Sequence, residues 1–414
     1  MSVFKPQVPD PGSLTLPESP SIVHLKNQAA DVLKTGAVTT LAGAQYAVAR
    51  AYGFVSWTAL KRELESRTLT GELKQAIDAG NYAAAKLLLK THPSLHKAKM
   101  GYGGSGPLTW VAECRVPRTA PTPERLAFAR WLIISGSDVH QGGDGPLMRA
   151  ALADERIPMM QLLLDHGANV NALWNGNYPI ILAPCETLAP ESLKWLLNHG
   201  ADPSLYSQKY GSPLAMVAFT YSRNAADKQR CLEVLAEHKL CLPNTPCMAL
   251  ARGRTDLVEG FLAEDPTLIN RCFSQQEIFP PEVGKPEDGL TFVPLEGGTL
   301  LHLAAEFEDY KMLEWLLKHG ANPNARAGGR TMGHTPLFHT VISVGDKLDV
   351  RTRMLLEAGA DPQIRADITK QLSDAPEPMI FEGVTPVEFA LGYSEQEWVN
   401  SAALSALESS ASSS

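Results

Sequence analysis

The chain has 414 residues, of which 44% are hydrophobic and 20% charged, and its formal net charge is −8. Because no Lys/Arg run exceeds two residues, we expect no nucleic-acid partner, which would need clustered basic side chains. No window has the ~18 uninterrupted apolar residues of a membrane span. The six cysteines form no C-x-x-C pair. Together these features predict a cytoplasmic protein with reduced thiols and no membrane contact.

The N-terminal part of the chain divides into two segments. Residues 1–20 are rich in proline and lack the apolar stretch of a secretory signal, so we expect a disordered leader. Residues 21–69 come next, and within them 22–66 has the pattern of three short helices. Ser56 is an expected N-cap, and Tyr52, Phe54 and Trp57 are expected packing residues. We interpret 21–69 as a helical cap on the region that begins at residue 70; the alternative is an independent functional domain.

From residue 70 to residue 407 a short motif recurs, in which a Gly, Ser, Thr or Tyr precedes Pro-Leu or a near equivalent. Its copies begin at Gly106, Gly145, Tyr178, Ser212, Thr245, Thr299, Thr335 and Thr385, with spacings of 39, 33, 34, 33, 54, 36 and 50 residues. A second marker, "HGAN" or "HGAD", occurs at residues 166, 199 and 319. A period near 33 residues predicts a stacked array of repeats.

One copy shows what each repeat contains. Thr299 is an expected N-cap, and most other copies follow the cap with Pro, which suits the first helical position. A short helix and a second amphipathic helix come after the cap, and Gly320 is expected to end the second helix in the left-handed conformation. Since helices this short are marginal alone, they must pack on neighbouring copies.

The pattern T-P-L-H-x-A-A, two helices and G-A-D/N-x-N resembles the ankyrin repeat. The resemblance covers about residues 70–407 and implies an all-α solenoid of about nine helix-turn-helix units with β-turn fingers. The "GFVSW" stretch at residues 53–57 resembles the helical leader that precedes ankyrin arrays in some bacterial proteins, so the chain is similar to that bacterial type. The serine-rich tail, 408–414, is expected to be disordered.

Three insertions interrupt the period, near 115–123, 272–298 and 365–384. In the ankyrin fold the second and third would lengthen finger loops. Their apolar residues either pack on the array or cover something bound there, and we expect the two fingers to wall a groove. The finger residues that we expect to contribute are Phe279, Phe292, Met379 and Phe381.

The resemblance also implies a column of inner-helix residues that face the concave surface. The candidate binding residues in and beside this column are Trp110, Glu113, Arg149, Met216, Phe219, Arg252, Glu306, His339 and Phe389. Such a mixture suits either a protein interface or a polar cleft. His302 is the structural histidine of the resembled motif, and His334 is expected to be exposed in a finger turn.

The motifs of known enzymes are missing from the sequence. It contains no HExxH, nucleophile-elbow or phosphate-loop pattern, and "GYGGSG" at 101–106 lacks the preceding strand of a dinucleotide site. We therefore expect no catalytic residues, metal or cofactor. The predicted function is a monomeric scaffold that binds a protein partner on its concave face and fingers; the alternative is an enzyme or small-ligand binder with a pocket under the two insertions.

Overall fold

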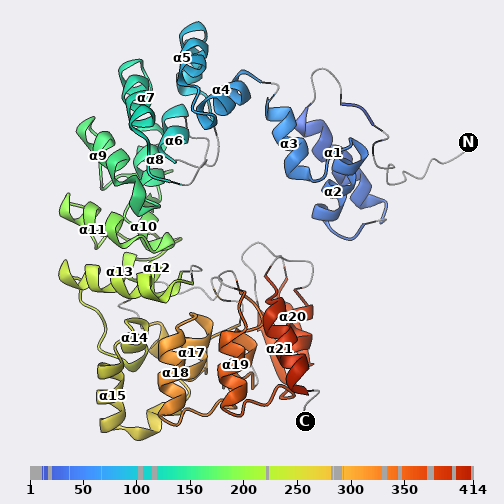
Figure 1. The fold of residues 1–414 in the computed structure, drawn as a ribbon, viewed down its shortest axis with the longest axis vertical. Helices are drawn as coiled ribbons and strands as arrows, with labels where there is room; N and C mark the ends of the chain where they lie inside the picture. Colours follow the sequence, from blue (N-terminus) through green and yellow to red (C-terminus); the bar gives the residue numbers. More distant parts are fainter. Residues whose placement is uncertain are drawn as a thin grey trace, which may run out of the picture. The chain divides into compact units, whose positions relative to one another are not determined.

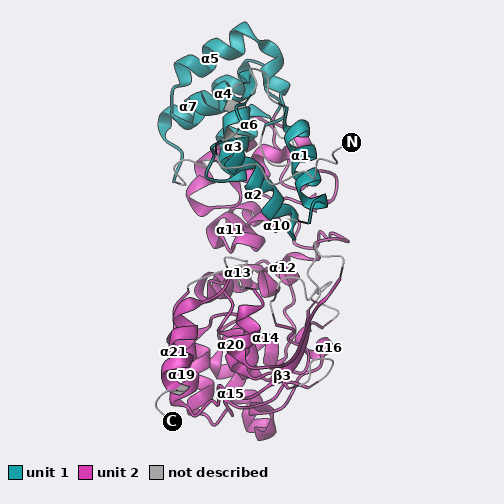
Figure 2. Ribbon diagram, turned by 90° about the vertical axis from the view of Figure 1, so that its right-hand side faces the viewer, with its two compact units in different colours: residues 1–138 teal, residues 139–414 magenta. Residues whose placement is uncertain are grey.

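The structure is a computed structural model of the whole chain. It describes residues 12, 14–16, 21–36, 38–66, 68–100, 106–113, 119–220, 223–280, 283, 291, 293–328, 333–343, 347–370, 377–393 and 398–411. The chain forms two compact units, residues 1–138 and residues 139–414 (Figure 2). Unit 1 and unit 2 denote these two parts below.

Unit 1 begins with three helices that share a core of their own. They are α1 (Ile22–Lys34), α2 (Leu41–Ala51) and α3 (Trp57–Ser66). Ser56 accepts a hydrogen bond from the Ala59 amide at 3.1 Å, so the expected N-cap is confirmed. The core contains Leu25, Ala29, Val32, Ala44, Val48, Ala49, Leu60 and Leu64, and the predicted packing residues Tyr52, Phe54 and Trp57 lie against it.

The rest of unit 1 consists of two helix pairs. The elements are α4 (Leu69–Asp78), α5 (Tyr82–Thr91), the 3₁₀ helix η1 (Pro93–Lys97), α6 (Pro107–Ala112) and α7 (Pro123–Ile134). Helix α3 packs against α4, and α4 against α6. The first insertion overlaps residues 114–118, which lie outside the described residues.

Unit 2 continues the same arrangement with successive pairs of short helices (Figure 1). Its helices up to the second insertion are α8 (Gln141–Ala150), η3 (Asp154–Arg156), α9 (Ile157–Asp165), α10 (Leu182–Thr187), α11 (Pro190–Asn198), α12 (Pro213–Phe219), α13 (Ala225–Glu237), α14 (Pro246–Ala251), α15 (Thr255–Glu264), η4 (Pro266–Ile269) and α16 (Gln275–Ile278). After it come α17 (Leu300–Glu306), α18 (Tyr310–Lys318), η7 (Pro336–His339), α19 (Val350–Glu357), α20 (Pro386–Leu391) and α21 (Ser401–Ala411).

Local sequence sets where these helices start and stop. The Ser212, Thr245 and Thr385 side chains each accept a hydrogen bond from the backbone three residues on, with Pro at the first helical position. Gly320 and Gly359 have φ of 91°, as expected for residues that end a helix in the left-handed region. Neighbouring pairs pack in series, α10 on α12 and α11 on α13, then α14 on α17 and α18 on α19, so the helices are buried by stacking.

The structure corrects the expectation of an all-α chain. Two antiparallel hairpins occur, β1 (Leu173–Trp174) with β2 (Tyr178–Pro179), and β3 (Ala366–Lys370) with β4 (Met379–Val384). The second hairpin is the third insertion, where the side chains of β3 alternate between buried and exposed, the period of a strand. The helix expected after Thr335 is one 3₁₀ turn, and α21 continues past residue 407, where a disordered tail was expected to begin.

Candidate functional site

The finger insertion at 272–298 packs onto the array. Phe273, Ile278, Phe279 and Val293 are each 4% exposed or less. The Phe279 ring lies 4.2 Å from the ring of Phe219, centroid to centroid. The other predicted finger residue of this insertion, Phe292, lies outside the described residues. The insertion is therefore part of the apolar core rather than a free loop.

This packing corrects the predicted concave column. Met216, Phe219, Glu306, His339 and Phe389 are all buried, at 8% exposure or less. Finger residues cover two of the column residues directly, because Phe279 contacts Phe219 and Phe381 lies 4.8 Å from Phe389. These five side chains do not form an open groove.

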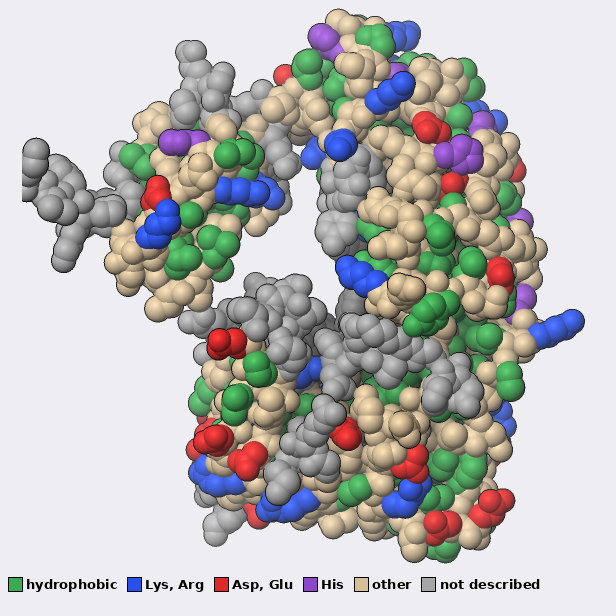
Figure 3. Space-filling model, turned by 180° about the vertical axis from the view of Figure 1, so that it is seen from behind, with side chains coloured by type: hydrophobic (Ala, Val, Ile, Leu, Met, Phe, Trp, Pro, Cys, Tyr) green, Lys and Arg blue, Asp and Glu red, His purple; other side chains and the backbone are tan. Residues whose placement is uncertain are grey.

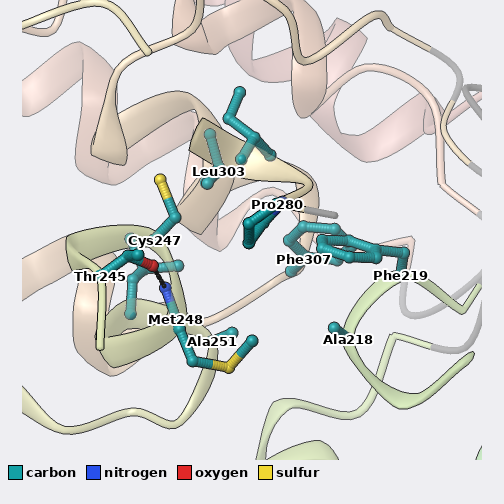
Figure 4. Close-up of a pocket in the computed structure, with 11 residues that line it drawn as sticks. Ala218, Phe219, Thr245, Cys247, Met248, Ala251, Pro280, Leu303 and Phe307 are labelled. Carbon is teal, nitrogen blue, oxygen red and sulfur yellow. Dashed lines mark hydrogen bonds between the residues drawn. The ribbon is translucent and has the colours of Figure 1, made fainter. Parts of the chain in front are cut away.

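A small pocket lies where the insertion meets α12, α14 and α17. Phe219, Pro280 and Phe307 lie close together along it, and Met248 and Leu303 also line it (Figure 4). The room for a water-sized sphere is about 10 Å³, close to that of a single water molecule. The Thr245 hydroxyl already accepts a hydrogen bond from the Met248 amide. Burial raises the pKa of the Cys247 thiol to about 12, so this thiol is not a nucleophile.

Two predicted site residues, Glu306 and His339, meet in a buried ionic cluster. The Nδ1 atom of His339 is 2.8 Å from one Glu306 carboxylate oxygen, and Arg223 donates to the other at 2.7 Å. Burial alone would raise the pKa of Glu306, but the hydrogen bond from His339 and the charge of Arg223 outweigh it and lower that pKa to about 2. Glu306 is therefore a buried carboxylate held by its partners.

Further buried charges surround this cluster. The Lys228 ammonium lies 3.4 Å from the centroid of the Phe307 ring and donates to the Ala218 carbonyl, and burial lowers the pKa of Lys228 well below its usual value. Arg351 pairs with Glu308 at 3.0 Å. Arg351 and Glu308 connect consecutive helix pairs, whereas Arg223 and Lys228 reach from the α12–α13 pair past α14–α15 to Glu306 and Phe307. Since the Arg223, Glu306 and His339 side chains are at most 4% exposed, a substrate cannot reach them in this conformation.

The sequence analysis did not identify Arg223 as a member of this buried cluster. It lies 83 residues from Glu306 in the chain, in the segment before α13 and outside every repeat motif. The motif position of Glu306 marked it for attention, but nothing near Arg223 indicated that it would point inward.

His339 of this cluster packs against two further histidines. The ring centroids of His302, His334 and His339 are 5.2 to 5.6 Å apart. The Nδ1 atom of His302 accepts from the Thr299 amide at 3.0 Å and its Nε2 is 3.2 Å from the His334 carbonyl, so its predicted structural role is confirmed. The prediction of an exposed His334 is wrong, because its side chain is completely buried and neither ring nitrogen has a partner among the described residues.

The remaining candidates are distributed over both units. In unit 1 the Trp110 indole donates to Asp78 at 2.9 Å, and Glu113 is buried. In unit 2 Arg252 makes a bidentate pair with Glu233, and Arg149 is half-buried. Trp110 and Arg252 thus each have a partner that lies outside the set of candidates.

The β3–β4 hairpin differs from the first finger because one of its faces is open. Phe381 stacks on Tyr393 at 5.9 Å as well as contacting Phe389, and Arg365 forms a bidentate pair with Glu388 beside it. On the other face Ile380 is 64% exposed. Met379 is half-buried. The hairpin is thus anchored on one side and presents an apolar side chain on the other.

Comparisons with known proteins agree with this architecture. The family model for the ankyrin repeat matches residues 296–327, and the model for three ankyrin repeats matches residues 122–207. The chain therefore contains ankyrin repeats, which are in general protein–protein interaction modules, within a mostly helical fold.

Two curated relatives share part of this array. The chain is 41% identical over 91 residues to mouse ankyrin repeat and MYND domain-containing protein 1, covering 20% of this chain and 9% of the relative. For the human protein the values are 40% over 128 residues, covering 30% and 12%. The chain thus matches only about a tenth of the length of these relatives. Both are mammalian, so the resemblance to a bacterial type gains no support from them.

Two further features of the described part of the chain concern membrane-spanning helices and metal-binding clusters. No helix in it is both long and apolar enough to cross a membrane. The same residues contain no group of three or more His, Cys, Asp or Glu side chains placed to hold a metal ion, and this includes the three packed histidines.

Proposed function

We propose that this chain is a protein-binding module whose partner contacts the finger surface of the last repeats, centred on the β3–β4 hairpin. The array would comprise about nine repeats over residues 70–407 with residues 21–69 as a cap, in a monomeric cytoplasmic protein. The observation that carries the proposal is the hairpin itself, which is folded before binding and exposes Ile380 at 64%. A preformed surface keeps the ordering cost of association low.

The alternative of a ligand pocket under the insertions has weaker support. The pocket found there is apolar and holds about one water, and the polar candidates Glu306 and His339 are occupied with each other and with Arg223. A small-molecule site normally combines a volume of hundreds of Å³ with convergent polar groups.

The proposal is tested by affinity capture from cells with quantitative mass spectrometry. The amount of the main partner captured by the Ile380→Asp variant should fall at least about tenfold, because burying a charge in an interface costs about 1.4 kcal/mol or more. Leu348→Asp is the matched control, because Leu348 is also exposed, at 50%, and lies in unit 2 outside the hairpin strands. An unchanged set of partners for Ile380→Asp, or an equal loss with Leu348→Asp, would refute the hairpin as the binding surface.

A further inference from the structure

On the second helices of the unit 1 repeats, two aliphatic side chains are highly exposed. Leu87 on α5 is 66% exposed and Ile134 on α7 is 75% exposed. Both belong to the second helix of a repeat. The second-helix segments "KLLLKTH" (86–92), "RWLIISG" (130–136), "QLLLDHG" (161–167), "KWLLNHG" (194–200) and "EWLLKHG" (314–320) align without gaps. The position of Ile134 is taken by Lys90, Asp165, Asn198 and Lys318, all polar and exposed, so isoleucine there is an exception.

The position of Leu87 shows a second difference between the units. In unit 2 it holds Trp195 and Trp315, and each of these rings stacks at 3.9 Å on the histidine four residues later. In α7 the equivalent residue is Trp131, and Ser135 stands where unit 2 has the histidine. Trp195 and Trp315 in unit 2 are therefore each stacked on a histidine of their own helix, whereas Leu87 and Trp131 in unit 1 have no histidine at that position.

The exposed residues of α5 and α7 lie on two neighbouring helices. The rings of Tyr82 and Phe128 stack at 4.7 Å, and the Lys86 ammonium lies 5.3 Å from the Trp131 ring centroid, so the two helices run side by side in the same direction. Lys90 lies ~6 Å beyond Lys86 along α5, and Ile134 ~4.5 Å beyond Trp131 along α7. Lys90 and Ile134 are thus at similar height. We call Lys86, Leu87, Lys90, Arg130, Trp131 and Ile134 the α5–α7 patch.

The patch is basic as well as apolar. Lys86, Lys90 and Arg130 make no ion pair with any other described residue. Helix α5 contains no acidic residue, and the one in α7, Glu124, is in its first turn, ~15 Å along the helix from Ile134. Unit 1 as a whole has more basic than acidic residues, with 16 Lys and Arg and 10 Asp and Glu in residues 1–138. Unit 2 has the opposite excess, with 21 Lys and Arg and 35 Asp and Glu in residues 139–414.

We propose that the α5–α7 patch binds an acidic amphipathic segment of a partner protein. Its apolar side chains would cover Leu87 and Ile134, and its carboxylates would pair with Lys86, Lys90 and Arg130, which have no carboxylate partner within the described chain. This surface is made of other residues than the β3–β4 hairpin and is tested by other variants, so either proposal can fail without the other.

Two other occupants fit the patch less well. A lipid surface would take up a projecting tryptophan, but Trp131 is half-buried, stacked on Phe128 at 5.8 Å and partly covered by Lys86. A second copy of this chain would have to offer acidic side chains from unit 2. On its second helices several of these are already paired, as in Glu314 with Lys318 and Glu191 with Arg230.

The test uses the full chain and a fluorescein-labelled helical peptide with leucine on one face and glutamate on the other. Fluorescence anisotropy should show binding that weakens with added salt, and a peptide with lysine in place of each glutamate should not bind. The double variant Lys90→Glu/Arg130→Glu should weaken binding at least about tenfold. Ile134→Asn should also weaken it, several-fold. The control is Lys194→Glu/Lys318→Glu, the same charge change at the same repeat positions in unit 2, which should bind as the wild type does.

Each other result contradicts the proposal. Failure of the glutamate peptide to bind the wild type, or an equal loss in the unit 2 control, would remove the patch as a site for acidic segments. Binding of the wild type, but not of Lys90→Glu/Arg130→Glu, to phosphatidylserine vesicles would assign the patch to membranes. A dimer seen by sedimentation velocity and abolished by the same variant would assign it to a second copy. Thermal unfolding of each variant checks that these exposed substitutions leave the fold intact.

Discussion

The two units of the molecule are built from the same kind of repeat but place their charges differently. Unit 2 buries charged groups between its helix pairs, where the side chains of Arg223 and Glu306 are 3% and 4% exposed. Unit 1 exposes Lys90, Arg130 and Ile134, and the two cations make no ion pair with any described residue. At the surface of the unit 2 region formed by α14–α21, acidic and basic side chains lie intermixed, as seen at the bottom of Figure 3.

The difference shows that equivalent positions of the repeat can hold either buried, paired charges or exposed charges. A buried ion pair must be satisfied within the protein, because a charge left alone there is strongly destabilising. An unpaired charge on the surface stabilises little and remains available to another molecule. The cluster around Glu306 thus serves the fold, and the α5–α7 patch is free to serve binding. Four measurements would break or sharpen this distinction.

The largest effect is expected from removing the cation of the buried pair. Arg223→Ala leaves the Glu306 carboxylate buried with one partner fewer, and we expect a loss of about 3–5 kcal/mol in the free energy of unfolding. Urea denaturation followed by circular dichroism measures it. Arg230→Ala is the control, since Arg230 pairs with Glu191 at the surface and should cost below about 1 kcal/mol. Equal losses in the two variants would abolish the proposed contrast.

Acid should destabilise unit 2 through its buried histidines. Burial lowers the pKa of His302 from 6.5 to about 3 and that of His334 well below 6.5. Below pH 6.5 the unfolded chain binds protons at these histidines that the folded protein does not bind. Each histidine therefore lowers the free energy of unfolding by about 1.4 kcal/mol for each unit by which the pH is lowered. The loss continues until the folded pKa is reached. The pKa of Glu306 is lowered to about 2, so this residue affects the stability only at lower pH.

Urea denaturation between pH 7 and 5 tests this dependence. The ring nitrogens of His334 have no partner among the described residues. Replacing His334 by Leu should therefore keep the stability at pH 7, and it should remove the contribution of one histidine from the dependence of stability on pH. A slope that is the same in His334→Leu as in the wild type would show that His334 is not buried and neutral.

Loss of the hairpin anchor should have a moderate effect. Phe381 is half-buried against Phe389 and Tyr393. Phe381→Ala should cost about 2 kcal/mol, less than the 3–5 kcal/mol of a fully buried phenylalanine. The neighbouring Ile380→Ala should change stability by less than about 0.5 kcal/mol, because the side chain is exposed. A reversed order of these two losses would mean that the opposite face of the hairpin packs on the array.

The smallest effect is expected at the exposed patch. Ile134→Lys introduces the residue that Lys90 and Lys318 supply at the same repeat position. Unfolding free energy should change by less than about 0.5 kcal/mol, whereas peptide binding should weaken. A destabilisation of several kcal/mol would show that Ile134 is covered within the chain and would place it in the fold rather than in a binding surface.

Sequence alone was sufficient for features that depend on neighbouring residues. The caps at Ser212, Thr245 and Thr385 and the positive φ of Gly320 and Gly359 agree with prediction, because each feature involves backbone groups only a few residues away. Five residues of the candidate column, which was expected to face the concave surface, are buried: Met216, Phe219, Glu306, His339 and Phe389. The fingers that cover Phe219 and Phe389 come from insertions with no repeat pattern to place them.

The sequence by itself determined that this chain is a stack of short helix pairs containing ankyrin repeats, since caps, glycine stops and apolar stripes recur with a fixed period. Tertiary structure decided that Glu306 meets His339 and Arg223, that His334 is buried, and that Leu87 and Ile134 are exposed. The reason is physical: capping is a local hydrogen-bonding event, whereas burial and ion pairing depend on which distant segments reach the same place.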